Sequence, residues 1–227
     1  MAFDLDGTLA TAGVIGLRAA LAATRAVTGR EPDVLPSRAG RTDTAIGLDM
    51  LLAAGVPRDE ASGLLGAYLS ALHDAATGLM ADYRDRARVL PGAREVLEEL
   101  NGRADVTPVL VTGNIRSVAE AKMTALGLHG LVVWGCGGYG GDSAVRANLV
   151  HTAWRAARAR TCAPIPPGRV IVVGDTPRDI DAARSAGVTA VAVATGAHTA
   201  AELAGADLVL PDLAGPRTAE RILSARP

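Results

Sequence analysis

The sequence predicts an α/β fold, with a parallel sheet covered by helices on both faces and a helical segment inserted after the first strand. Three observations support this prediction. From Val89 onward, short β-rich runs alternate with amphipathic helical runs, which is typical of parallel sheets between helices. Residues 14–86 are rich in Ala and Leu and contain no convincing run of β-branched residues. A short predicted strand precedes that helical segment, with the apolar residues Met1, Ala2, Phe3 and Leu5 interrupted by a carboxylate.

A chain of 227 residues is long enough for one large domain or for a core with a modest second unit. We expect the core to comprise residues 1–13 and 87–227, and the helical unit to comprise residues 14–86. Hydrophobic residues make up 49% of the chain but aromatic residues only 3%, so Ala, Val and Leu must form most of the core.

The net charge of −1, without a basic block, predicts no nucleic-acid partner. No apolar run reaches the ~18 residues of a membrane span, and no basic-then-apolar leader precedes the first strand, so we expect a cytoplasmic protein with no membrane partner. Cys136 and Cys162 fit neither a disulfide framework nor a metal-ligand spacing. The sequence leaves monomer and homodimer equally open.

Within the helical unit, apolar residues at helical spacing predict three longer helices and a short fourth one. They are expected at residues 14–29, 43–54 (capped by Thr42 or Asp43), 58–75 and just before Arg86.

The rest of the chain supplies the expected sheet and its covering helices. The predicted strands are residues 107–112, 131–134, 169–174, 189–194 and 207–210. The predicted helices are residues 92–100, 115–126, 144–159 and 177–187.

The first strand carries two carboxylates, Asp4 and Asp6. Side chains at positions i and i+2 share one face of a strand, so these carboxylates should project together. Two like charges in an apolar setting need a cation between them, and Mg²⁺ with oxygen ligands is the natural candidate. The alternative is a strand end that enters a polar turn. Since only three residues precede Asp4, either the strand is unusually short or the polypeptide begins upstream of Met1.

Polar groups also follow two later strands. Thr112-Gly113-Asn114 ends the second strand, and Asp175 and Asp179 follow the run 169–174. Because ligands gather beyond the carboxyl ends of parallel strands, we expect these groups to meet Asp4 at one sheet edge. Local alternatives remain open, since Asn114 could cap a helix and Asp179 could complete a capping box.

The run Phe3-Asp4-Leu5-Asp6-Gly7-Thr8-Leu9 resembles the first motif of the haloacid dehalogenase-like hydrolase superfamily, in its phosphatase form. The resemblance implies a Rossmann-like core, an inserted helical cap of the C1 type and Mg²⁺-dependent hydrolysis of a small phosphorylated metabolite. It implies that Asp4 is the nucleophile that forms an aspartyl-phosphate and that Asp6 is the general acid/base. Thr112 resembles the residue that hydrogen-bonds the phosphoryl group, with Gly113 and Asn114 beside it.

The same resemblance implies that Asp4, Asp175 and the carbonyl oxygen of Asp6 hold Mg²⁺, with Asp179 as the second acid of the fourth motif. The third motif usually carries a lysine. The single lysine of the chain, Lys122, is expected to be a solvated surface charge, so Arg146 is assigned to the phosphate instead.

Gly40-Arg41-Thr42-Asp43 is similar to a substrate-facing cap loop of phosphoglycolate phosphatase-like members, so Arg41 either binds an anionic substrate group or is an ordinary loop arginine. The phosphonoacetaldehyde-cleaving members of the family form a Schiff base on a lysine of the inserted domain, and residues 14–86 contain no lysine, so this mechanism is excluded. The dehalogenase branch lacks the second aspartate of the first motif, so the presence of Asp6 disfavours that branch. The sequence therefore predicts a phosphatase similar to phosphoglycolate phosphatase. A phosphomutase of the β-phosphoglucomutase type and a catalytically silent metabolite-binding protein are the alternatives.

Overall fold

The computed structural model describes residues 1–11 and 15–225 of the chain. The predicted boundary between the core and the helical unit, at residues 13 and 14, lies outside the described residues. Within these ranges, no helix is both long enough and apolar enough to cross a membrane.

A six-stranded parallel sheet forms the centre of the molecule, with strand order β3-β2-β1-β4-β5-β6. This arrangement confirms the predicted α/β fold class. The strands are β1 (Ala2–Phe3), β2 (Val109–Thr112), β3 (Gly138–Tyr139), β4 (Ile171–Gly174), β5 (Thr189–Val193) and β6 (Leu208–Leu210). The two-residue β1 lies between β2 and β4, so the sequence just after it reaches the middle of the sheet edge.

Strand β4 shows how the alternation of its side chains builds two hydrophobic layers. Ile171 and Val173 point to the face covered by α5 (Ala93–Asn101), α6 (Arg116–Ala125) and α9 (Thr218–Ser224). Val172 points to the opposite face, which α7 (Arg146–Thr161) and α8 (Pro177–Ala186) cover. Successive side chains of a strand alternate between faces, so a buried strand must be apolar on both.

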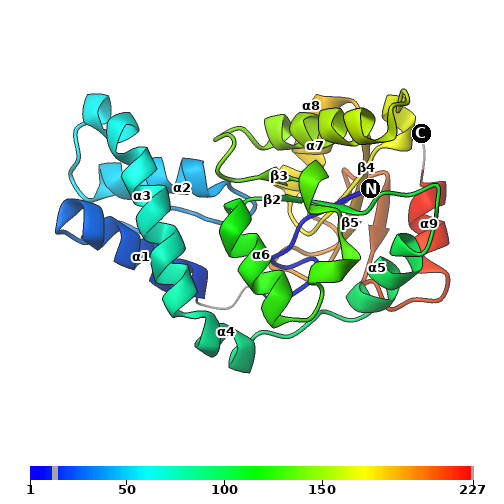
Figure 1. Ribbon diagram of the computed structural model, residues 1–227, viewed down its shortest axis with the longest axis horizontal. Coiled ribbons are helices and arrows are strands. Elements are labelled where there is room, and N and C mark those ends of the chain that lie inside the picture. Colours follow the sequence, from blue (N-terminus) through cyan, green and yellow to red (C-terminus); the bar gives the residue numbers. More distant parts are fainter. Residues whose placement is uncertain (12–14, 226–227) are drawn as a thin grey trace.

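Four helices lie between β1 and α5 (Figure 1). They are α1 (Ile15–Thr28), α2 (Asp43–Ala53), α3 (Arg58–Gly78) and α4 (Met80–Arg86). Of these, α1, α2 and α3 pack mainly on one another, and α4 packs against α6. Helices α1, α2 and α3 bury a cluster that includes Met50, Tyr68 and Leu72, and this cluster meets the rest of the molecule through Ile115 and Val118. The helical character predicted for this segment is confirmed.

The predicted strand at 131–134 is wrong. Residues His129–Leu131 and Trp134–Cys136 form two short 3₁₀ helices, and the third strand lies later, at Gly138–Tyr139. A short apolar run does not reveal whether it is a strand or another buried segment. The observed strand needs glycine at its first position, because a Cβ at Gly138 would lie 2.1 Å from the carbonyl oxygen of Leu149 in α7.

Candidate active site

Loops that follow β1, β2 and β4 meet at one edge of the sheet and face the helical segment. Together they line a cavity of about 440 Å³. Most of the residues singled out in the sequence border it: Asp4, Asp6, Arg41, Thr112, Gly113, Asn114, Arg146 and Asp175. Asp179 lies behind this lining, next to Asp4 and Asp175.

Three buried carboxylates form an acidic cluster at this edge. Asp4, Asp175 and Asp179 each place one oxygen within 4.8 Å of the others, and each residue is at most 5% exposed. The structure therefore brings together acids that are separated by about 170 positions in the chain, as the strand-edge argument predicts. The carboxylate of Asp6 is directed elsewhere, although Asp6 lines the same cavity.

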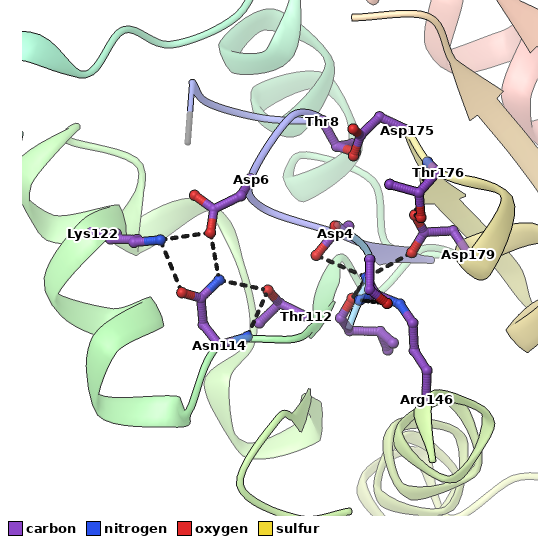
Figure 2. Close-up of polar contacts among 12 residues, drawn as sticks. Asp4, Asp6, Thr8, Thr112, Asn114, Lys122, Arg146, Asp175, Thr176 and Asp179 are labelled. Atoms are coloured by element: carbon purple, nitrogen blue, oxygen red, sulfur yellow. Dashed lines mark hydrogen bonds and ion pairs between the residues drawn. The ribbon is translucent and has the colours of Figure 1, made fainter. Parts of the chain in front are cut away.

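Arg146, in the first turn of α7, is the cation of this cluster. Its Nη2 lies 3.0 Å from Asp4 Oδ1 and 2.6 Å from Asp179 Oδ1 (Figure 2). Its Nη1 donates a hydrogen bond to the carbonyl oxygen of Gly40, in the loop before α2. Burial by itself would lower the pKa of Arg146, but Asp179 and Asp4 raise it above its ordinary value. The guanidinium therefore stays charged.

The surroundings raise the pKa of two of these carboxyl groups. Burial raises the pKa of Asp4 to about 6, with Arg146 opposing the shift. Burial and the neighbouring charges of Asp4 and Asp179 raise the pKa of Asp175 to about 8. Three carboxylates and one guanidinium carry a formal charge of −2, which a divalent cation would neutralise.

Two glycines, Gly7 and Gly196, leave the space that the carboxylate of Asp175 occupies. A Cβ at Gly196 would lie 1.7 Å from Asp175 Oδ2, and a Cβ at Gly7 would lie 2.3 Å from the same oxygen. Gly7 also has a φ of +90°, a conformation that residues with side chains rarely adopt. Thr8 donates a hydrogen bond of 3.0 Å to the other oxygen, Oδ1. The carboxylate is therefore held in one orientation beside Asp4.

Asp179 completes the capping box that its sequence context allows, and its side chain also lies in the acidic cluster. Its Oδ2 accepts hydrogen bonds from the backbone N–H and the hydroxyl of Thr176, which completes the N-terminal cap of α8. Its Oδ1 faces Arg146. The capping interaction fixes the side chain so that its second oxygen belongs to the acidic cluster.

These residues fit a hard divalent cation. Mg²⁺ prefers carboxylate oxygens and is usually bound by one or two of them together with substrate oxygens. Asp4 and Asp175 offer such oxygens, and Asp179 places a third carboxylate oxygen within 4.8 Å of theirs. The cluster therefore suits the Mg²⁺ expected from the sequence.

A second polar network surrounds Asp6. Asp6 Oδ2 accepts hydrogen bonds from Lys122 Nζ at 2.6 Å and from Asn114 Nδ2 at 2.8 Å (Figure 2). Asn114 Nδ2 also donates to Thr112 Oγ1, and Asn114 Oδ1 accepts from Lys122 at 2.9 Å. The side chain of Asn114 is thus engaged with protein groups, and it links the acid Asp6 to the hydroxyl of Thr112.

The expectation that Lys122 is a solvated surface charge is wrong. Lys122 is 2% exposed and lines the cavity. A sequence signal for this position exists, because Val118, Ala119, Lys122 and Met123 have the spacing of one helix face and all four are buried. The lysine stands on the apolar stripe of its helix, where a surface charge is not expected.

The N-terminus of α2 is fastened to the loops of the core. Asp43 Oδ2 accepts a hydrogen bond of 2.7 Å from the backbone N–H of Ile115, and Thr44 donates to the carbonyl oxygen of Gly140. Burial raises the pKa of Asp43 to about 6. Gly113 permits this contact, since a Cβ there would lie 2.0 Å from the carbonyl oxygen of Arg41.

Two arginines of the loop before α2 border the cavity, and only one of them is engaged. Arg41 pairs with Asp49 at 2.6 Å and donates hydrogen bonds to the carbonyl oxygens of Ser37 and Ala45. Arg38, which the sequence did not single out, forms no side-chain hydrogen bond or ion pair with another described residue. Burial lowers its pKa, while Asp6 and Asp43 act in the opposite direction. Arg38 is therefore the better placed of the two to meet an anionic ligand.

Comparison with known proteins identifies a family for the chain and several solved structures with a similar fold. The model of the haloacid dehalogenase-like hydrolase family matches residues 1–187. No curated protein matches the chain.

Several solved structures share the fold over nearly the whole chain. CbbY from Rhodobacter sphaeroides, in complex with phosphate, has a TM-score of 0.65 and 21% identity, with 94% of this chain and 93% of that chain covered. A β-phosphoglucomutase from Clostridium difficile has a TM-score of 0.65 and 16% identity, with 94% and 90% covered. A putative phosphoglycolate phosphatase from Lactobacillus plantarum has a TM-score of 0.60 and 16% identity, with 93% and 94% covered.

Proposed function

The chain belongs to the haloacid dehalogenase-like hydrolase family and is a hydrolase, and from this premise we propose that it is a Mg²⁺-dependent phosphatase. Its substrate is a small phosphate monoester, and the reaction passes through an aspartyl-phosphate on Asp4. The observation that carries the proposal is the buried cluster of Asp4, Asp175 and Asp179 with Arg146 at the edge of the sheet.

In the proposed reaction Asp4 attacks phosphorus and the bond to the leaving oxygen breaks. Asp6 donates a proton to that oxygen and later accepts a proton from the water that hydrolyses the aspartyl-phosphate. Asp4, Asp175 and the carbonyl oxygen of Asp6 are the proposed Mg²⁺ ligands, with Asp179 in support. When bound, the ion offsets the negative charge of the phosphate and the carboxylates.

Thr112 and Arg146 are the proposed phosphate-binding side chains. Thr112 Oγ1 accepts hydrogen bonds from the backbone and side-chain nitrogens of Asn114, so its own hydrogen is free to be donated to a phosphate oxygen. Arg146 can donate to two oxygens at once and keeps its charge. Both side chains are buried at the cavity, where such interactions gain strength because water is excluded.

The helices α1 to α4 are the proposed cap, formed by residues 14–86. The hydrogen bonds of Asp43 with Ile115 and of Thr44 with Gly140 join this cap to the loops of the core beside the cavity. Release of these contacts would admit the substrate. Arg38, which borders the cavity and forms no ion pair with the residues that the structure describes, is the proposed site for a second anionic group of the substrate. A cytoplasmic location stays a prediction.

A panel of phosphorylated metabolites and p-nitrophenyl phosphate tests this proposal. We expect phosphate release that depends on Mg²⁺ and stops when a chelator is added, and Asp4→Asn should lower it by about a thousandfold or more. Isomer formation without net phosphate release would favour the phosphomutase. No turnover of any compound would favour the catalytically silent protein and contradict the proposal.

A further inference from the structure

The single lysine of the chain is buried beside the proposed acid/base. Lys122 lies on the inner face of α6 and is 2% exposed. Taking an ammonium group out of water is unfavourable unless charged and polar partners replace the water. The structure supplies such partners, and they are residues of the proposed active site.

The partners of Lys122 are two side chains from different loops. Its Nζ lies 2.6 Å from Asp6 Oδ2 and 2.9 Å from Asn114 Oδ1, and it stands 5.7 Å from the centre of the Tyr83 ring. The side chain of Asp6 is 24% exposed whereas that of Lys122 is 3% exposed. Lys122 therefore holds Asp6 from the protein side and leaves the carboxylate at the cavity.

Lys122 also determines which way the amide of Asn114 faces. A lysine ammonium can only donate hydrogen bonds, so the group that faces it must be the amide oxygen. The amide nitrogen is then directed to Asp6 Oδ2 and Thr112 Oγ1. With the amide reversed, its nitrogen would face Nζ and its oxygen would face the carboxylate, so that both contacts would be repulsive.

We propose that Lys122 is a positioning residue for proton transfer by Asp6. Its ammonium group binds Oδ2 of Asp6 directly. It also orients the amide of Asn114, whose nitrogen donates both to this same oxygen and to the hydroxyl oxygen of Thr112. This inference rests on the proposed phosphatase function, since it assigns Asp6 the transfer of a proton to the leaving oxygen.

A purely structural role would have a different consequence. If Lys122 only neutralised a buried charge, its loss would lower stability and would reduce the activity toward all substrates alike. A positioning role affects the substrates that need a proton on the leaving oxygen. Alkyl phosphates need it, because an alkoxide is a poor leaving group, whereas p-nitrophenolate leaves without protonation.

The experiment compares kcat/KM for an alkyl phosphate and for p-nitrophenyl phosphate in Lys122→Met, with saturating Mg²⁺. This constant covers the steps up to departure of the leaving group. General acid catalysis contributes roughly 10²–10⁴-fold, so we expect a loss of about a hundredfold for the alkyl ester and of less than about threefold for the aryl ester. Asp6→Asn should give the same pattern. Lys122→Arg, which keeps the charge, should recover at least about tenfold of the loss with the alkyl ester.

Arg116→Gln is the matched control, because Arg116 lies on the same helix and is 55% exposed. It should leave both constants unchanged. If the Lys122→Met protein does not fold, Lys122→Gln takes its place in the comparison. Thermal unfolding of the variant shows whether it is folded. Equal losses for the two esters, or a rise in KM without a change in kcat, would overturn the positioning role. Absence of Mg²⁺-dependent hydrolysis by the wild type would instead overturn the proposed function.

Discussion

Arg146 Nη2 lies 3.0 Å from Asp4 Oδ1, and both side chains are less than a tenth exposed. The pair joins the first turn of α7 to the end of β1, two segments that are far apart in the sequence. Arg146 also pairs with Asp179 and donates to the carbonyl oxygen of Gly40, so one guanidinium connects the acidic cluster to the helical segment.

Replacing Arg146 by Met should destabilise the protein, because Asp4 and Asp179 would lose their buried counter-charge. Breaking a buried ion pair by removing one partner costs about 3–5 kcal/mol. Urea unfolding at neutral pH without metal measures this loss. Arg146→Lys keeps a positive charge and should lose less. A methionine variant as stable as the wild type would contradict the assigned role of the pair.

Replacing Gly196 by Ala should weaken Mg²⁺ binding by about tenfold or more, since the new Cβ would occupy the position of Asp175 Oδ2 and displace that ligand. The Mg²⁺ dependence of activity and calorimetric titration measure the effect. Gly205→Ala is the control, because its Cβ would lie 3.8 Å from the nearest atom, a side-chain carbon of Ile180. Equal Mg²⁺ affinity in the two variants would contradict the claim that Gly196 leaves the space in which Asp175 binds the ion.

Replacing Arg38 by Ala should raise KM by about tenfold for a phosphate ester that carries a second anionic group, with little change in kcat. A charge-assisted hydrogen bond to the substrate contributes about 1.5–3 kcal/mol, which supports a change of this size. Esters without a second charge should be affected less. Arg41→Ala serves as the comparison, because Arg41 is already paired with Asp49. If Arg41→Ala raises KM more than Arg38→Ala does, then Arg41, and not Arg38, binds the second anionic group of the substrate.

Replacing Asp43 by Asn should change how stability depends on pH. Burial raises the pKa of Asp43 from 3.8 to about 6, so its contribution to stability is present at low pH and is lost as the pH rises through about 6. The asparagine does not ionise, yet its oxygen can still accept the hydrogen bond from Ile115. We therefore expect the difference in Tm, variant minus wild type, to increase between about pH 4 and pH 7. Thermal unfolding across this range measures it, and a flat or falling difference would contradict the raised pKa.

Much of the fold could be predicted because its signals are local. Each of these signals acts within a few residues: the buried run that forms β4, the cap of α8 made by Thr176 with Asp179 of its first turn, and Gly187 at the end of that helix. The strand at 131–134 was predicted wrongly for the opposite reason. Only Val132 of that run is buried, and β3 instead begins at Gly138, where the close approach of Leu149 in α7 leaves no room for a Cβ. No local pattern in the sequence encodes that approach.

By itself the sequence determined the element order and which acids end the strands, since these follow from periodicity and from the shared edge of a parallel sheet. Only the tertiary structure decided which cation faces which acid. Lys122 is 116 positions from Asp6, and Arg146 is 142 positions from Asp4. Such pairings depend on how whole helices pack on the sheet, so a lysine that resembles a surface charge in the sequence is buried against a carboxylate in the fold.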